Sequence, residues 1–142
     1  MKNNLLKILF LLVLGFFVSA ILRSGEVTAS GVNNIGVQVM QKERLGSFLA
    51  AGNGMTLYYF TKDERNVSHC IEGCAVNWPP FYVDPSATFE GCESSDFATI
   101  KRDDGRKQTT YKDMPLYHFI NDKYSGDTFG QGIGEVWFVV TP

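Results

Sequence analysis

The feature that most constrains this chain is an internal repeat. Residues 43–79 align without a gap on residues 102–138, at a spacing of 59 residues, with eight identical positions. The identical pairs are Gly46/Gly105, Met55/Met114, Leu57/Leu116, Tyr58/Tyr117, Phe60/Phe119, Asp63/Asp122, Gly73/Gly132 and Trp78/Trp137. Self-similarity at a fixed period indicates two copies of one supersecondary unit that bury a shared core. We predict that a pseudo-two-fold axis relates them.

Each copy has the same order of turns and strands. A glycine-containing turn precedes a short strand, and Asp104-Gly105 is a strong hairpin signal. A second turn, at residues 52–54 or 112–113, leads into a strand rich in aromatic residues. The predicted strands are residues 37–41, 47–51 and 55–61 in the first copy and 97–102, 107–111, 114–120 and 135–140 in the second.

A sustained helical period is missing from the sequence downstream of residue 30, and only residues 70–77 have room for a helical turn. The predicted fold class is therefore all-β, with about eight short strands in one small β-sandwich or barrel-like domain.

The first 29 residues have the layout of an export signal. Lys2 and Lys7 precede an apolar run at residues 8–22, and Val27 and Ala29 occupy the −3 and −1 positions of a cleavage site. The run is short for a membrane span, which needs ~20 residues. An uncleaved anchor stays open, because a thinned bilayer accommodates a shorter run.

We therefore predict an extracytoplasmic protein, in the periplasm or on the cell surface. Its single domain would cover residues 30–142, with a first repeat at about 43–80, a link at 81–101 and a second repeat at 102–142. A membrane is an expected partner only if residues 1–29 are retained.

The charge of the predicted mature chain excludes one class of partner. Without residues 1–29 the chain holds 10 Lys and Arg against 14 Asp and Glu, a net charge of −4. This balance argues against nucleic acid as the main partner. The same segment holds eight Phe, six Tyr and two Trp, which supply a core for a domain of this size.

The repeated residues have structural and functional interpretations. Tyr58 and Phe60 share one face of a strand, as do Tyr117 and Phe119, with His118 on the opposite face. These pairs form either the core or a stacking platform for a flat ligand or sugar. Trp78 and Trp137 complete the repeated motif. Asp63 and Asp122 follow the strand, where a carboxylate accepts backbone N–H groups of the next loop. The alternative is a hard-cation site at Asp122 and Asp127.

The three cysteines predict one disulfide. Cys70 and Cys74 are the pair at short range, and Phe129 and Ile133 occupy the matching positions, which predicts an apolar pair with the same packing role. A redox-active dithiol, or a metal or haem site that uses His69 or His118, is the competing interpretation, but CxxC and CxxCH spacings are absent. We predict no cofactor. Cys92 is a free thiol, a cross-link to another chain, or an alternative partner for Cys70 or Cys74.

Two blocks of this sequence resemble a known family. They are Thr56-Leu57-Tyr58-Tyr59-Phe60-Thr61-Lys62-Asp63 and Ser68-His69-Cys70-Ile71-Glu72-Gly73-Cys74-Ala75-Val76-Asn77-Trp78-Pro79-Pro80. Both are similar to the secreted repeat of unknown function, also described as predicted lipoproteins with a Yx(FWY)xxD motif. The resemblance implies a bacterial cell-envelope protein and no particular reaction. The chain departs from the family in lacking a lipoprotein cysteine and in having Cys92.

Three functions follow as hypotheses. The first is a non-catalytic exported module that binds or stabilises another envelope or membrane protein, because the sequence lacks a nucleophile–base arrangement and the common catalytic motifs. The second is an accessory of extracytoplasmic electron transfer that holds a metal or haem or uses its cysteine pair. The third is an enzyme acting on a wall or sugar substrate, for which Asp63 and Asp122 are the candidate carboxylates.

Overall fold

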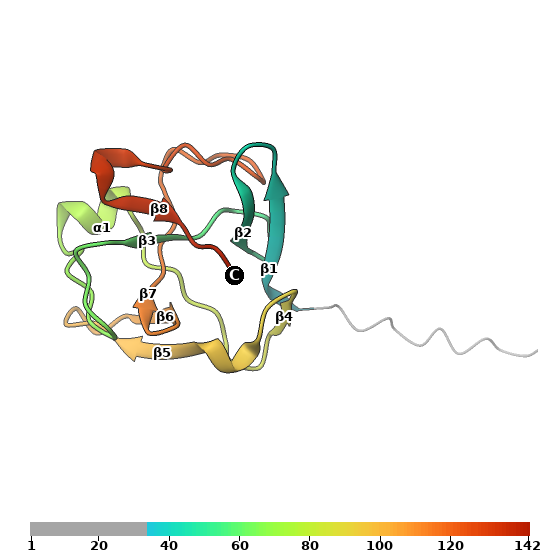
Figure 1. The fold of residues 1–142 in the computed structure, drawn as a ribbon. Helices are drawn as coiled ribbons and strands as arrows, with labels where there is room; N and C mark the ends of the chain where they lie inside the picture. Colours follow the sequence, from blue (N-terminus) through green and yellow to red (C-terminus); the bar gives the residue numbers. More distant parts are fainter. Residues whose placement is uncertain (1–33) are drawn as a thin grey trace, which may run out of the picture. The chain divides into compact units, whose positions relative to one another are not determined.

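The computed structural model describes residues 34–142, which form eight short strands in three small sheets (Figure 1). The strands are β1 (Ile35–Lys42), β2 (Gly46–Ala51), β3 (Tyr58–Phe60), β4 (Thr88–Glu90), β5 (Phe97–Lys101), β6 (Lys107–Tyr111), β7 (Met114–Pro115) and β8 (Trp137–Val139). The helical segments are α1 (Gly73–Asn77) and the 3₁₀ turns η1 (Ser94–Asp96) and η2 (Ile133–Glu135). The all-β prediction is confirmed.

The predicted signal or anchor segment, residues 1–29, lies outside the described residues. In the described part of the chain, the helices are too short or too polar to cross a membrane.

The two repeats each begin with an antiparallel hairpin. In the first, β1 pairs with β2 from Val37 opposite Ala51 to Lys42 opposite Gly46. In the second, β5 pairs with β6 from Phe97 opposite Tyr111 to Lys101 opposite Lys107. The third sheet joins the repeats, because β3 of the first repeat pairs with β8 at the end of the second.

The alignment of the repeats needs small gaps, so the ungapped match was wrong in detail. Leu49 donates its backbone N–H to Val140, and Thr109 donates the equivalent bond to Phe81. The hairpins therefore match at a spacing of 60 residues, while Tyr58 and Tyr117 match at 59. The turn at residues 52–54 has one residue more than the turn at 112–113, and this absorbs the difference.

The predicted strand 114–120 is much shorter in the structure. Only Met114 and Pro115 form β7, and Tyr117 makes isolated bridges to Tyr58 and Pro80. The segment that lies beside residues 117–120 contains Pro79 and Pro80, which have no N–H to donate. Proline removes ladder hydrogen bonds and so prevents a continuous strand here. The first repeat pairs instead with Trp137–Val139, which has no proline, and β3 forms.

The link between the repeats contains a strand that the sequence pattern did not predict. β4 pairs in parallel with β1, with Phe89 opposite Val37. The preceding part of the link lies against β1, because a Cβ on Gly36 would contact Val83 and lie 2.7 Å from Ala87. A strand of three residues has too little alternation for its period to be read from sequence.

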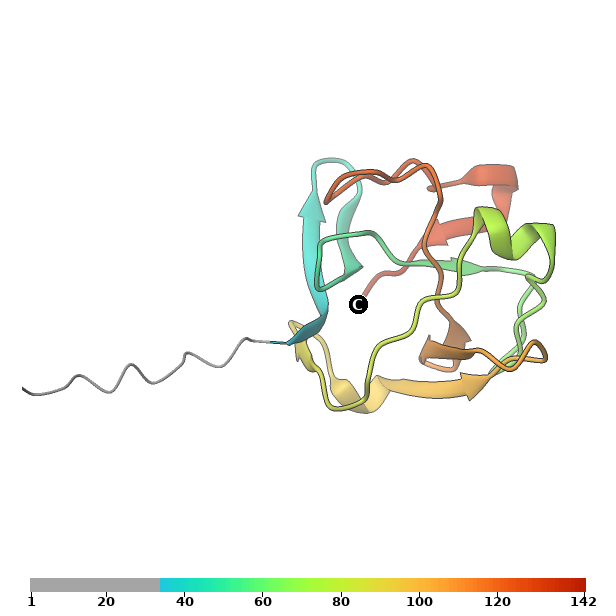
Figure 2. The same ribbon diagram turned by 180° about the vertical axis from the view of Figure 1, so that it is seen from behind.

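Both repeats contribute to both parts of the core. One cluster consists of Phe48, Ala50, Tyr58, Cys70, Trp78, Tyr117, Phe119, Trp137 and Val139. The other consists of Val37, Leu49, Ala51, Leu57, Phe81, Tyr111, Leu116 and Val140. The equivalent segments α1 and η2 lie at the same end of the domain. The turn η2 faces the viewer in Figure 1, and α1 faces the viewer in the reverse view of Figure 2.

Replacing Gly36 by alanine tests the packing of the link on β1. The added methyl group has no space beside Val83 and Ala87, so we expect Gly36→Ala to lower the free energy of unfolding by about 1–3 kcal/mol. Urea denaturation measures the change. Gly73→Ala is the control, because nothing lies within 4 Å of its added Cβ. Equal stability of both variants and the wild type would contradict this packing.

Candidate functional site

The repeated tyrosine and aspartate residues bond across the two repeats. Tyr58 donates its hydroxyl to Asp122 Oδ2 at 2.6 Å, and Tyr117 donates its hydroxyl to Asp63 Oδ2 at the same distance. Between the tyrosines, each backbone N–H donates to the carbonyl of the other at 2.9 Å. Each of these bonds thus has its counterpart in the other repeat, as the predicted pseudo-two-fold relation requires.

The second oxygen of each aspartate holds the loop that follows it. Asp63 Oδ1 accepts the backbone N–H of His69 at 2.7 Å, and Asp122 Oδ1 accepts that of Phe129 at 3.0 Å. This is the arrangement that a carboxylate placed directly after a strand predicts. Both carboxyl groups are buried, and both oxygens of each accept hydrogen bonds from within the domain. Each aspartate therefore links its own loop to the opposite repeat.

The two tryptophans form the middle of a stack of four rings. Trp78 lies on Trp137 with ring centroids 3.8 Å apart and planes within 3°. Phe60 stacks on the outer face of Trp137 and Phe119 on that of Trp78, each with a centroid separation of 4.3 Å. Tyr58 also packs edge-on against Trp78, at 5.4 Å. The repeated aromatic residues therefore form the core, and the stacking-platform interpretation was wrong.

Burial sets the protonation of these groups. It raises the pKa of Asp63 and of Asp122, because the charged carboxylate loses its hydration, and the tyrosine hydroxyl opposes this only in part. It raises the pKa of Tyr58 and Tyr117 as well, and the neighbouring carboxylate adds to that rise. Both phenols stay protonated and act as donors at neutral pH.

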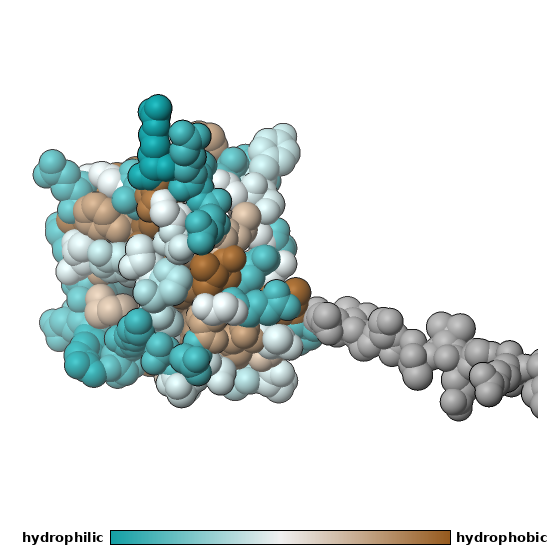
Figure 3. Space-filling view, turned by 45° about the vertical axis from the view of Figure 1, so that its right-hand side comes forward, coloured by the Kyte–Doolittle hydropathy of each residue, from teal (hydrophilic) through white to brown (hydrophobic). Residues whose placement is uncertain are grey.

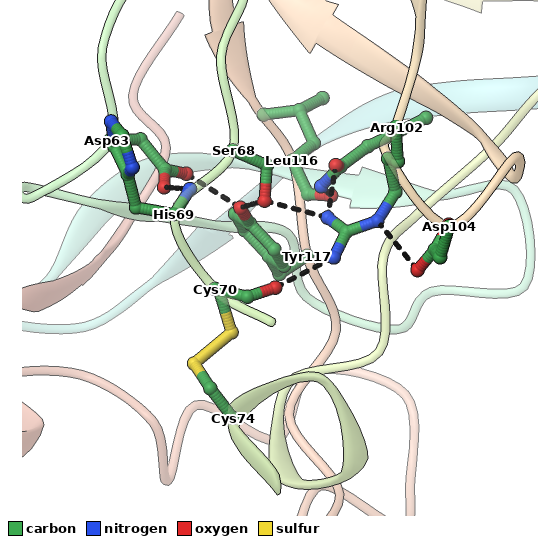
Figure 4. The surroundings of a disulfide bond; sticks show 10 residues. Asp63, Ser68, His69, Cys70, Cys74, Arg102, Asp104, Leu116 and Tyr117 are labelled. Atoms are coloured by element: carbon green, nitrogen blue, oxygen red, sulfur yellow. Dashed lines mark hydrogen bonds and ion pairs between the residues drawn. A yellow bond between two sulfur atoms is a disulfide. The ribbon is translucent and has the colours of Figure 1, made fainter. Parts of the chain in front are cut away.

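A buried arginine extends this network and was not singled out from the sequence. Arg102 is 6% exposed and donates to Ser68 Oγ, Gln108 Oε1 and the carbonyl of Cys70, each at 2.6 Å (Figure 4). Ser68 Oγ in turn lies 2.7 Å from Tyr117 Oη. In the first repeat Lys42 occupies the matching position and donates to Thr128 Oγ1 at 2.9 Å. The alignment at a spacing of 60 residues, rather than 59, would have revealed this pair.

Cys70 and Cys74 form a disulfide at the start of α1 (Figure 4). The predicted apolar replacement in the second repeat was wrong, since Phe129 is 66% exposed and Ile133 is 38% exposed. Because Asp63 bonds to His69 and Asp122 bonds to Phe129, these two residues are equivalent. The counterpart of Cys70 is therefore Gly130 and not Phe129. Gly130 is needed there because a Cβ would lie 2.7 Å from the Tyr58 ring.

The candidate metal ligands do not come together. Asp127 accepts the backbone N–H groups of Lys123 and Tyr124, which lowers the pKa of its carboxyl group. His69 is half-exposed and lies 3.4 Å from Glu64, while His118 packs edge-on against Phe81, and burial lowers the pKa of its imidazole. Within residues 34–142, no three His, Cys, Asp or Glu side chains are grouped to hold a metal ion.

Cys92 is the free cysteine of the described residues. The Cys70–Cys74 bond excludes the interpretation in which Cys92 pairs with either of them. It lies in the link between the repeats, where its thiol is partly buried, and burial raises the thiol pKa, which keeps the less reactive thiol form at neutral pH.

The fold and its centre define an all-β domain built from two interlocked copies of one repeat. The chain belongs to the family described as the secreted repeat of unknown function, whose profile matches residues 40–82 and 98–141. A family described as secreted supports an extracytoplasmic location. Comparison with curated proteins and with solved structures returned no match.

Removing one tyrosine hydroxyl tests the bond between the repeats. We expect Tyr58→Phe to lower the free energy of unfolding by about 1–3 kcal/mol, because it leaves the buried Asp122 without its donor. Urea denaturation at pH 7 measures the loss. Tyr59→Phe is the matched control, because no hydrogen bond joins the hydroxyl of this neighbouring residue to another of residues 34–142. A loss of equal size in the control would count against the role of the Tyr58–Asp122 bond.

The raised pKa of Asp122 predicts an unusual dependence of stability on pH. A carboxyl group whose pKa is higher in the folded than in the unfolded state favours folding more when it is protonated. The stability of the wild type relative to Asp122→Asn should therefore rise as the pH falls from 7 towards the usual value of 3.8.

Urea denaturation of both proteins at several pH values measures this difference. Asp127→Asn is the control of opposite sign, because the lowered pKa of Asp127 gives stability that is lost as the pH falls below 3.8. If acidification destabilises the wild type relative to Asp122→Asn, the assignment of a raised pKa is wrong.

Breaking the disulfide tests its structural role. A bridge across five residues closes a small loop, so we expect reduction to lower the free energy of unfolding by about 2 kcal/mol. The measurement compares oxidised and reduced protein in the Cys92→Ser background, which removes the free thiol. An unchanged stability after complete reduction would contradict a stabilising bridge.

Proposed function

We propose that this protein is a non-catalytic exported module that binds another protein of the cell envelope through the two loops held by Asp63 and Asp122. The observation that carries the proposal is the contrast between these loops and the site beneath them. The repeated motif side chains are used inside the domain, whereas the loops direct large apolar side chains outwards.

The exposed apolar residues are concentrated in these loops. The described part of the chain has eight exposed large apolar side chains, and six of them lie between residues 64 and 77 or between 123 and 135. The six are Val67, Ile71, Val76, Tyr124, Phe129 and Ile133. Figure 3 brings the opposite side of the domain forward, the side on the right in Figure 1, and there apolar side chains lie among hydrophilic ones. A concentration of exposed apolar side chains in neighbouring parts of a surface is typical of protein-binding sites.

The loops are held in place, which favours binding. The disulfide and the Arg102–Cys70 bond fix the first loop, and Lys42 and Asp122 fix the second. A loop that is already ordered loses little conformational entropy when it binds a partner. The net charge of −4 for residues 30–142 fits a protein partner better than a polyanion.

The candidate catalytic carboxylates support a non-catalytic role. Asp63 and Asp122 are 7% and 5% exposed, and each accepts a tyrosine hydroxyl and a backbone N–H. In that arrangement both groups serve the fold. The electron-transfer hypothesis stays a prediction, and no contact among the described residues favours it.

In-cell photo-cross-linking tests the proposal. A photoreactive amino acid is placed at Ile71 or at Phe129 in the full-length protein, and the adducts are identified by mass spectrometry. We expect both positions to give the same protein adduct, because both loops would contact one partner. Glu43, exposed on the turn between β1 and β2, is the control position and should give no such adduct. Adducts that are absent from both loops, or equally frequent at Glu43, would contradict the proposal.

A further inference from the structure

The pseudo-two-fold relation fails at one sheet edge. In the first repeat the outer edge of β1 is covered by β4, and Gly91 continues alongside Val39. In the second repeat the equivalent strand is β5, which ends its three-stranded sheet in the order β5-β6-β7. No strand among residues 34–142 covers the outer edge of β5. In Figures 1 and 2 this strand runs along the lower rim of the domain.

The uncovered edge has backbone groups that point outwards. Thr109 of β6 donates its N–H to Phe81 and accepts from Leu116, so its backbone groups are used on the side away from β5. Thr99, which lies opposite Thr109, therefore belongs to a pair without mutual hydrogen bonds. Its N–H and C=O point away from β6, and by alternation those of Lys101 and the C=O of Phe97 do so too. The N–H of Phe97 is not free, because it donates to the carbonyl of Ser94.

The difference in burial between β1 and β5 agrees with an uncovered edge at β5. Val37 of β1 is fully buried and Val39 is partly buried beneath the link. Their counterparts in β5 at the spacing of 60 residues are Phe97, which is partly buried, and Thr99, which is exposed. An edge that presents unpaired N–H and C=O groups is a template for a further strand.

A small apolar pocket opens beside this edge. It has a volume of about 70 Å³, and its lining includes Val83, Pro85, Phe89, Phe97 and Thr99. Its size fits one apolar side chain of an added strand. Lys101 and Lys107 lie opposite each other at the far end of β5, where they favour an acidic residue.

We propose that the outer edge of β5 binds an extended segment of a partner protein, which adds to the sheet as a strand parallel to β5. The expected segment has an apolar residue that enters the pocket and an acidic residue that approaches Lys101. The protein itself supplies the template, because Thr88-Phe89-Glu90 occupies the equivalent edge of β1. Strand addition combines backbone bonds for affinity with side-chain pockets for specificity. This site lies apart from the two apolar loops, so either proposal can fail without the other.

An appended segment tests whether the edge accepts a strand. The backbone N–H of Val140 donates to Leu57 and that of Phe81 to Leu116, which makes Pro142 the counterpart of Val83. We would therefore add a copy of residues 84–93, with Cys92→Ser, directly after Pro142. We expect hydrogen exchange at the Thr99 amide to slow by about tenfold or more, because this N–H gains an acceptor.

The control tail has the same sequence with prolines at the positions copied from Thr88 and Glu90, which remove two N–H donors. It should leave the exchange rates at those of the parent protein. Unchanged exchange with the first tail, or equal slowing with both tails, would overturn the proposal.

A second experiment addresses the natural partner. A photoreactive amino acid replaces Lys101 in the full-length protein, and Thr99→Pro is compared with Thr99→Val in that background. Proline at an edge position removes the outward N–H and leaves the ladder to β6 intact, whereas valine keeps this donor. We expect a protein adduct in the Thr99→Val variant and at least about a tenfold loss in Thr99→Pro at equal thermal stability.

An equal yield in both variants, or no adduct in either, would overturn the proposal. The loop-binding proposal is tested separately, with the photoreactive amino acid at Phe129 in the Thr99→Pro variant. Adducts that persist there would support loop binding even if strand addition fails, so the two failures are distinguishable.

Discussion

The structure depends on two hydroxyl–carboxylate bonds that exchange partners between the repeats. Tyr58 donates to Asp122, and Tyr117 donates to Asp63, so each repeat supplies the buried hydroxyl partner of the other. A buried acceptor without its donor costs about 1–3 kcal/mol, and here two such penalties fall on any compact arrangement that places the repeats differently. The stacked pair Trp78 and Trp137 adds an apolar contact between the repeats, because each ring buries the face of the other. The repeats therefore form one cooperative unit in which identical residues are retained on both sides of the axis.

The same network determines what the loops can do. Each repeated aspartate uses one oxygen to hold the opposite repeat and the other to hold its own loop. Other contacts that differ between the repeats also stabilise the loops. They are the disulfide and the buried Arg102 in the first repeat, and Lys42 and the closely packed Gly130 in the second. Because the fastening is internal, the apolar side chains of both loops are free to face outwards. The residues of the repeated motif therefore stabilise the fold, and other residues form the exposed surface of the loops.

The sequence predicted the parts of this structure that follow from local chemistry. The hairpin strands, the short helical turn near Cys74 and the loop-holding role of Asp63 and Asp122 all depend on residues close together in the chain. Three features depend on distant residues and were missed. The exchange of tyrosine partners requires the relative placement of the repeats. Pro79 and Pro80 shorten the strand at residues 114–120 by lacking donors in a segment almost 40 residues earlier. The small gaps in the alignment concealed the pairs Lys42/Arg102 and Cys70/Gly130, and these became visible only through equivalent hydrogen bonds.

Symmetry in such a domain makes its exceptions informative. Two equal repeats present the same hairpin edge twice, and β4 covers one copy while no strand within residues 34–142 covers the other. The covering segment belongs to the link, which has no counterpart in the repeat itself, so the cover is an addition to the repeat. An uncovered edge is an aggregation hazard unless it is short, charged or paired. β5 is short and ends in Lys101, which limits uncontrolled pairing without removing the outward N–H and C=O of Thr99. The edge is thus protected against long flat strands and remains open to a short segment that brings the right side chain to the adjoining pocket.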